Sequence, residues 1–110
     1  MSGLTYLLKK LRRAGRPMLE RDLERNARME VEDLGGWMLK WVSPGQNGVP
    51  DNLIFWPGGV VHFVEFKKPD GGKRTWQQTE VHKDLHKLGT KVFTIYSEKD
   101  WEAYLRGRGE

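Results

Sequence analysis

The stretch PDNLIFWPGGVVHFVEFKK, residues 50–68, decides the fold of this chain. Its two apolar runs, 52–56 and 60–67, predict β-strands, and the Pro-Gly-Gly segment between them predicts a tight hairpin turn. With a three-residue turn, Trp56 faces Val60, and this pair sets the register of the whole hairpin.

Two carboxylates meet where this hairpin becomes charged. In the predicted register Asp51 lies opposite Glu65, with Cβ atoms about 4.5–5.5 Å apart. Lys67 lies on the same face as Glu65, because side chains alternate along a strand. Opposed like charges destabilise a sheet unless a positive charge lies between them, and carboxylate oxygens suit Mg²⁺ or Mn²⁺. The pattern favours metal-dependent phosphodiester hydrolysis. The alternative is a surface ion pair of Glu65 and Lys67, with Asp51 as a turn residue.

The segments around the hairpin predict helices and further strands. Apolar residues at helical spacing predict a helix that Gly35-Gly36 ends. Thr75 and Gln78 form a capping-box pattern at the start of another helix. The expected elements are a helix over 17–34, strands over 37–42, 52–56 and 60–67, a helix over 75–88, a strand over 91–96 and a helix over 98–106. The predicted class is α/β, in the order α-β-β-β-α-β-α, with a mixed central sheet flanked by helices.

Length and composition exclude several classes of protein. The chain has 110 residues, a formal net charge of +4 and no cysteine. The length fits one domain, the charge permits an anionic partner such as nucleic acid, and thiolate metal sites are excluded. No apolar run is long enough for a transmembrane helix and the N-terminus lacks a secretory signal, so we expect a cytoplasmic protein without a membrane partner.

Three parts of the chain are expected to differ in character. Residues 1–16 form a basic amphipathic segment, which is either a packed or dimer-contacting helix or a phosphate-binding arm. Residues 17–106 form the single folded domain, and residues 107–110 form a flexible tail.

The residues Pro50-Asp51 and Glu65-Phe66-Lys67 match the motif of the PD-(D/E)xK nucleases. The longer context is more specific: MLERDLERN, GGWMLKWVSPGQNGVPDNLIFWPGGVVHFVEFKKP and QQTEVHKDLHKLGTKVFTI closely resemble the virus-type replication-repair nuclease (VRR-NUC) family, in the small stand-alone form found in bacteriophages. The resemblance covers roughly residues 18–101. It implies a restriction-endonuclease-like core of this superfamily, in the order predicted above.

The resemblance also implies an activity. The small phage members look like endonucleases that depend on Mg²⁺ or Mn²⁺ and act as homodimers on branched DNA such as four-way (Holliday) junctions. The implied catalytic residues are Glu20, Asp51, Glu65, Lys67 and Gln78. The implied metal ligands are Asp51, Glu65, the backbone carbonyl of Phe66, and Glu20. Contacts with nucleic acid are expected from Lys40, Lys68, Lys73 and Arg74.

Some of these assignments stay open on the residues alone. Glu24 lies one helical turn after Glu20 and is an alternative to it. Gln78 either only closes the capping box with Thr75 or also lies at the edge of the active site. Lys40 either contacts phosphate or is a solvated strand residue.

Other functions compete with this interpretation. A double-stranded RNA-binding domain also runs α-β-β-β-α, but it explains neither the acidic residues and Lys67 nor the strand over 91–96. A nuclease without structure selectivity is a second alternative. His82 and His86 have a spacing that can bind zinc, but no third ligand is evident, which favours an ordinary, partly exposed pair.

The sequence does not decide which aromatic and leucine residues contact a second copy in a dimer. Trp37, Trp41 and Trp56 alternate in predicted strands, which favours core or interface packing over base stacking. The residues that suit either a dimer contact or the core are Leu4, Leu7, Leu8, Leu11, Trp101 and Tyr104.

Overall fold

The computed structural model describes residues 19–67 and 74–108. In chain order its elements are α2 (Glu20–Asp33), β1 (Trp37–Lys40), β2 (Asn52–Trp56), β3 (Val60–Phe66), α3 (Trp76–Lys87), β4 (Val92–Ile95) and α4 (Glu98–Gly107). The predicted order α-β-β-β-α-β-α is confirmed. Among the described residues no helix is both long and apolar enough to cross a membrane.

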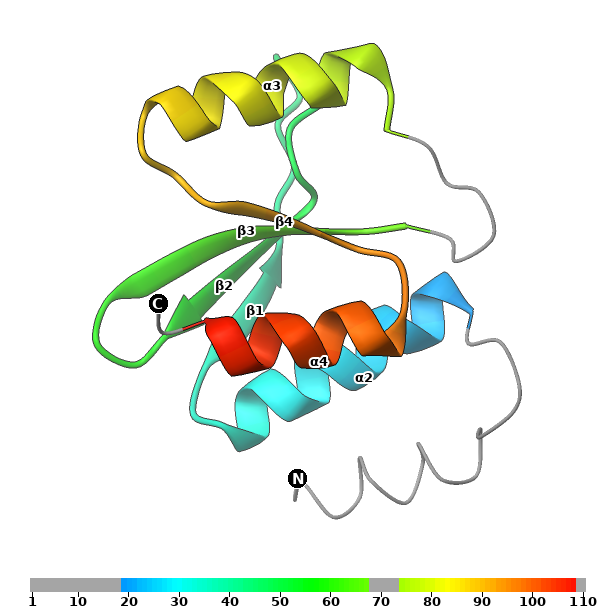
Figure 1. Cartoon of the computed structure of the whole chain (residues 1–110), viewed down its shortest axis with the longest axis vertical. Helices are drawn as coiled ribbons and strands as arrows, with labels where there is room; N and C mark the ends of the chain where they lie inside the picture. The colour runs from blue at the N-terminus through cyan, green and yellow to red at the C-terminus, as the bar shows by residue number, and fades with distance from the viewer. Residues whose placement is uncertain (1–18, 68–73, 109–110) are drawn as a thin grey trace.

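The four strands form one mixed sheet in the order β1-β2-β3-β4. The first three strands pair antiparallel, and β4 pairs parallel with β3. Helices α2 and α4 cover one face of the sheet, and α3 lies on the other (Figure 1). The parallel fourth strand separates this fold from a three-stranded RNA-binding domain, and the predicted α/β class with helices on both faces is confirmed.

The hairpin of β2 and β3 has the register expected from its sequence. Trp56 pairs with Val60, and Asn52 pairs with Val64. Gly58 and Gly59 of the turn have φ values of 90° and 83°, a region that residues with a side chain rarely adopt. One step beyond the last pair, Asp51 and Glu65 therefore stand at the same end of the two strands.

The hydrophobic core lies between the sheet and the layer of α2 and α4. Helix α2 contributes Leu23, Ala27 and Val31, which recur at the helical spacing seen in the sequence. Helix α4 contributes Trp101 and Tyr104, both buried. These two residues belong to the core, which settles the choice between core and dimer contact that the sequence left open.

Several expected boundaries are wrong by a few residues. Helix α2 begins at Glu20 and not at 17, because Leu19 has an extended backbone. Strand β1 ends at Lys40 and not at 42, and Trp41 and Val42 are exposed. The helix expected over 75–88 is α3, which ends at Lys87, and Leu88 is 81% exposed. The expected segment over 1–16, and with it the leucines proposed as dimer contacts, lies outside the described residues.

Candidate active site

Glu65 stands at the end of β3 with its side chain turned toward α3, and it is only 2% exposed. Its Oε1 accepts a hydrogen bond from Gln78 Nε2 at 3.1 Å. Its Oε2 is buried without a hydrogen-bond donor among the described residues, and the nearest cation, Lys67 Nζ, is 3.8 Å away. Burial raises the pKa of Glu65, and the charge of Lys67 opposes that shift. The alternative of a surface ion pair is therefore wrong.

Asp51 precedes β2 and is half-buried. Asn52 Nδ2 donates a hydrogen bond to Asp51 Oδ1 at 3.0 Å and fixes the carboxylate in place. Burial raises the pKa of Asp51, the charge of Lys40 lowers it, and the charge of Glu24 raises it. The charge of Asp51 in turn raises the pKa of Glu65, so the two predicted carboxylates are close enough to interact.

Gln78 closes the capping box and also contacts Lys67 and Glu65. In the capping box of α3, Thr75 N donates to Gln78 Oε1 at 2.9 Å, and Gln78 N donates to Thr75 Oγ1 at 3.2 Å. The same Oε1 accepts a hydrogen bond from Lys67 Nζ at 3.0 Å, while Nε2 donates to Glu65. An amide can do this because it carries both an acceptor and donors. Gln78 therefore holds the lysine and the buried carboxylate in fixed positions.

Glu20 and Glu24 of α2, the two candidates for the third acidic residue, lie near different members of this site. Glu24 forms ion pairs with Lys40 and, at 3.9 Å, with Arg28. Glu20, one turn earlier, is half-buried and raises the pKa of Glu65 through its negative charge. Glu20 forms no ion pair with another residue of the described part of the chain.

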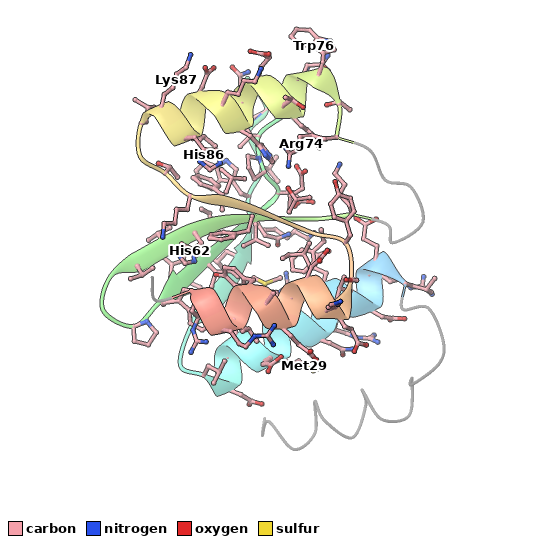
Figure 2. All side chains as sticks on the ribbon, in the orientation of Figure 1. Met29, His62, Arg74, Trp76, His86 and Lys87 are labelled. Carbon is pink, nitrogen blue, oxygen red and sulfur yellow. The ribbon has the colours of Figure 1, made fainter. Side chains whose placement is uncertain are left out.

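The expected nucleic-acid contacts are described only in part. Lys40 lies at the end of β1, pairs with Glu24 and keeps a half-exposed side chain. Arg74 Nη2 donates to Thr94 Oγ1 at 2.9 Å, and its charge lowers the pKa of Glu65. Figure 2 shows Arg74 between α3 and the sheet. Lys68 and Lys73 lie outside the described residues.

His82 is the site residue that the sequence interpretation missed. It is 4% exposed, and its Nε2 lies 3.9 Å from Glu65 Oε1. Burial, together with the positive charge of Arg74, lowers the pKa of His82 to about 4, so the imidazole is neutral near pH 7. The expectation of a partly exposed pair holds for His86 alone. The available signal was the helical repeat, because His82 lies one turn after Gln78 on the same face of α3.

Gly48 brings the loop before β2 against the first turn of α3. A Cβ at this position would lie 2.5 Å from the carbonyl carbon of Gln77 and 2.8 Å from the nitrogen of Gln78, and its φ is 86°. Only glycine permits this approach. The contact fixes the strand end that carries Asp51 relative to the helix that carries Gln78.

The site suits a hard divalent cation by its donor chemistry. Asp51 and Glu65 supply carboxylate oxygens, and Glu65 Oε2 is a buried acceptor whose hydrogen-bonding capacity the described residues do not use. The described ranges contain no group of three or more histidine, aspartate or glutamate side chains placed to hold a metal ion together. Glu20 as a third ligand therefore stays a prediction.

Comparison with known proteins finds similarity both in sequence and in structure. No family model matches the chain. A curated protein of Acyrthosiphon pisum secondary endosymbiont phage 1, described as "Putative nuclease p44", is 42% identical over 79 residues, which span 72% of this chain and 84% of the phage protein. A solved structure described as a VRR_NUC domain superposes with a TM-score of 0.75 at 33% identity, covering 80% of this chain and 95% of the other.

Proposed function

The chain belongs to the VRR-NUC family of nucleases, and we propose that it is a metal-dependent endonuclease that hydrolyses phosphodiester bonds in DNA. The observation that carries this proposal is the buried carboxylate of Glu65, which has one oxygen without a donor and Lys67 beside it. A fold that buries such a charge without satisfying it loses stability, so a function accounts for its presence.

Mg²⁺ or Mn²⁺ would be held by Asp51, Glu65 and the backbone carbonyl of Phe66, with Glu20 as a further metal or water ligand. Such an ion polarises the phosphate and lowers the pKa of a bound water. The carbonyl of Phe66 is a reasonable ligand because alternation along β3 directs it toward β2, beyond the last paired residue, Asn52. The residue that would face it there, Pro50, has no N–H to donate.

Lys67 is the residue of this chain that acts on the phosphate. Gln78 Oε1 holds its ammonium group at 3.0 Å and leaves the other ammonium protons available. A positive charge fixed before the reaction stabilises the negative charge that grows on the phosphate oxygens during hydrolysis. The substitution of Lys67 should therefore lower kcat more than it weakens DNA binding.

We further propose that the enzyme prefers branched DNA, such as a four-way junction, and acts as a homodimer. Support for the dimer comes from the face of the sheet that carries α3. Trp37, Phe55 and Val61 lie side by side on three strands of this face, and all three are exposed. The Trp37 and Phe55 rings are 6.3 Å apart. A second copy would cover this apolar row and place two active sites about a two-fold axis, which suits a two-fold symmetric junction.

Lys40 and Arg74, together with Lys68 and Lys73 of the loop before α3, are the proposed contacts with the DNA backbone. At a net charge of +4, binding should weaken as the salt concentration rises. A phage nuclease meets its DNA in the cytoplasm of the host cell, and we propose the same place of action for this chain.

Cleavage of labelled DNA tests the proposal directly. Four-way junction, linear duplex and single-stranded DNA are each incubated with Mg²⁺, with Mn²⁺ and with EDTA, using the native protein, Lys67→Ala and the control Lys99→Ala. Lys99 is an exposed lysine in the first turn of α4, away from the site. Metal-dependent cuts near the branch by the native protein and the control, but not by Lys67→Ala, are expected. Equal cutting of every DNA would support metal-dependent hydrolysis but contradict the preference for branched DNA. No cutting with either metal would contradict the proposed function.

A further inference from the structure

Trp41 lies directly beside the candidate active site, just beyond the end of β1. Its backbone N–H donates to the Asp51 carbonyl at 2.8 Å. This hydrogen bond continues by one step the antiparallel register in which Lys40 pairs with Asn52. Directly opposed residues of an antiparallel pair place their side chains on the same face, with Cβ atoms about 4.5–5.5 Å apart. Trp41 is therefore the cross-strand neighbour of the proposed metal ligand Asp51.

The side chain of Trp41 is open to solvent, unlike those of the core tryptophans. Trp41 is 44% exposed, whereas Trp56 and Trp101 are buried. The Trp56 indole donates to the Tyr104 hydroxyl at 2.8 Å, and the Trp101 indole donates to Glu30 at 3.1 Å. The Trp41 side chain makes neither a hydrogen bond nor a ring contact with another described residue. Packing among the described residues therefore leaves this indole available to another partner.

Trp41 is also separate from the apolar row proposed as the dimer contact. That row includes Trp37, at the other end of β1, whose ring is 6.3 Å from that of Phe55. From Trp37 to Trp41 the chain advances by about 13 Å at the rise of a β-strand. Because β1 is an edge strand, no other strand of the described sheet covers Trp41 from its outer side. The surface beside Asp51 is therefore open to a ligand of the active site.

The backbone holds the loop that begins at Trp41 at both of its ends. At the first end, the Trp41 N–H is bonded to the residue that carries the carboxylate of Asp51. At the second end, Gly48 lies against the backbone of Gln77 and Gln78 in α3. A flat ring on a backbone that is positioned before binding needs little further ordering when a ligand stacks on it.

We propose that Trp41 is a stacking platform for a nucleobase next to the cleaved phosphate, and that it selects DNA in which a face of that base is exposed; this assignment rests on the proposed nuclease function. With a metal ion held by Asp51 and Glu65 at the phosphate, the flat groups of the substrate nearest to Trp41 are the bases of the adjoining nucleotides. Stacking on an aromatic side chain tolerates every base, because every base has a π-face. The contact therefore recognises the structure of the DNA and not its sequence.

The exposure of the base explains why such a contact discriminates between DNA structures. In a continuous duplex each base is stacked on both faces, so an indole reaches a base only after that base has been unstacked. This cost is smallest where a base is mismatched or already single-stranded, and stacking is also interrupted at a branch. Trp41 thus supplies a physical reason for the preference for branched DNA, while the hydrolysis itself depends on the carboxylates and Lys67.

The cleavage of two DNAs by matched variants tests this role. The kcat/KM in Mg²⁺ is measured for a four-way junction and for a linear duplex of the same sequence, using the native protein, Trp41→Leu, Trp41→Phe and Trp76→Leu. Trp76 is the control, since it is 72% exposed in the first turn of α3. At about 100° per helical residue, it faces away from Gln78 and the site.

We expect Trp41→Leu to lose selectivity because leucine is apolar but has no π-face. Its kcat/KM should fall about tenfold for the junction and change little for the duplex. Trp41→Phe keeps an aromatic ring and should retain most of the native preference, as should Trp76→Leu. Equal losses on both DNAs, or the same loss of preference in Trp76→Leu, would overturn the proposal.

A fluorescent base reports the contact itself and needs no cleavage. 2-Aminopurine, whose fluorescence is quenched by stacking, replaces single bases around the branch, and saturating protein is added in EDTA. The native protein and Trp76→Leu should quench at least one position next to the branch. Trp41→Leu should bind, as fluorescence anisotropy shows, but leave that position bright. Equal quenching by the native protein and Trp41→Leu would overturn the stacking contact.

The combined results separate the failure of this proposal from the failure of the nuclease function. If the native protein does not cut under any condition, the proposed function fails, and the quenching alone decides whether Trp41 contacts a base. If the native protein cuts and Trp41→Leu keeps the native preference, only the role of Trp41 fails. If Trp41→Leu converts a native dimer to a monomer in sedimentation velocity, Trp41 is a subunit contact and the stacking role is overturned. If Trp41→Leu assembles like the native protein but loses the preference and the quenching, both proposals stand.

Discussion

At the scale of single residues, Glu65 combines deep burial with incomplete hydrogen bonding. Gln78 Nε2 donates to one oxygen and nothing described donates to the other, while the negative charges of Asp51 and Glu20 oppose its ionisation. Lys67 offsets part of this cost from 3.8 Å. The residue therefore destabilises the metal-free fold when it is charged, which is expected where a site is built to receive a cation.

The first prediction concerns the stability of Glu65→Gln without metal. Because burial raises the folded-state pKa of Glu65 above its ordinary value of 4.5, the stabilisation from its bound proton is complete below pH 4.5 and is lost as the pH rises through the folded-state pKa. Glutamine keeps the shape and carries no charge. In EDTA the variant should therefore have a higher Tm than the native protein at pH 8, by a margin that shrinks toward pH 4.

Thermal unfolding followed by circular dichroism measures this difference. Glu80→Gln is the control, since Glu80 is exposed on α3 and pairs only with Lys83 in the described structure. A Glu65→Gln variant with the same or a lower Tm at pH 8 would show that the buried carboxylate is already satisfied in the metal-free protein.

At the scale of elements, the first turn of α3 joins a local cap to the active site. The capping box is a property of Thr75 and Gln78 alone, whereas the contacts with Lys67 and Glu65 need the helix to dock on the sheet. Two substitutions separate these roles. Thr75→Ala removes a cap but leaves the Gln78 amide in the site; Gln78→Glu keeps an acceptor for the cap but loses the donor to Glu65.

We expect Thr75→Ala to lower mainly the stability and Gln78→Glu to lower mainly the activity. Thr75→Ala should cost about 1 kcal/mol of unfolding free energy and retain most of the nuclease activity. Gln78→Glu should retain the helix but lower kcat at least tenfold, because its carboxylate faces Glu65 and holds Lys67 in a stronger ion pair. Urea unfolding and initial cleavage rates measure the two effects, and equal activity losses in both variants would contradict the division of roles.

The loop before β2 depends on a glycine for its contact with α3. Gly48→Ala would place a Cβ within 3 Å of the backbone of Gln77 and Gln78 and would force a side chain into a left-handed conformation. We expect a loss of at least about 1 kcal/mol in unfolding free energy and a lower kcat, because Asp51 and Gln78 would move apart. In the same loop Gly45 has no atom within 4 Å of an added Cβ, so Gly45→Ala should behave like the native protein. A native-like Gly48→Ala would show that the loop can shift without cost.

At the scale of the whole molecule, the helices cover the two faces of the sheet unequally. Helices α2 and α4 cover one face of the sheet and α3 lies on the other (Figure 1). On the face of α3, Trp37, Phe55 and Val61 are exposed. Contiguous exposed apolar residues on a sheet mark interaction surfaces. This arrangement favours the proposed homodimer over a monomer.

Sedimentation velocity measures the expected change in assembly. Phe55→Lys places a charge in the middle of the apolar row and should convert a dimer to a monomer, with little change in the far-UV circular dichroism spectrum. Val42→Lys is the matched control, because Val42 is exposed outside the sheet. A native protein that sediments as a monomer at micromolar concentration, or a Phe55→Lys variant that stays dimeric, would contradict this interface.

The sequence by itself determined the features that arise from neighbouring residues. The alternation of Asn52–Trp56 and Val60–Phe66 around a glycine turn was enough to predict the pairing of Trp56 with Val60, because turn length dictates hairpin register. The helix cap at Thr75 was equally local. Helix and strand ends were less exact: Leu19 is extended before α2, and Trp41 lies beyond the end of β1.

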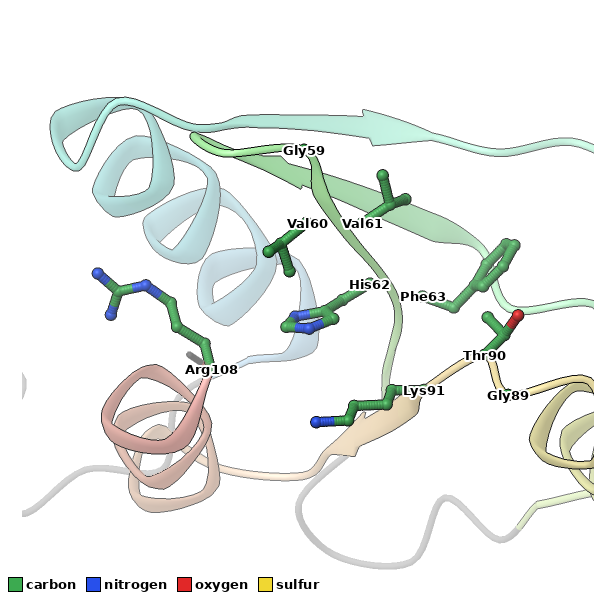
Figure 3. Close-up of a pocket in the computed structure, with 9 residues that line it drawn as sticks. All are labelled: Gly59, Val60, Val61, His62, Phe63, Gly89, Thr90, Lys91 and Arg108. Carbon is green, nitrogen blue, oxygen red and sulfur yellow. The ribbon is translucent and has the colours of Figure 1, made fainter. Parts of the chain in front are cut away.

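Only the tertiary structure decided how the elements meet. Gln78 contacts Glu65, and His82 is buried beside Glu65, because α3 docks on the sheet. Glu20 raises the pKa of Glu65 and Glu24 raises that of Asp51 because α2 docks on the sheet. The cavity lined by His62, Lys91 and Arg108 likewise combines residues of β3, of the turn before β4 and of the end of α4 (Figure 3). Periodicity reports which face a side chain occupies, but the distance between two elements depends on the packing of all the residues between them.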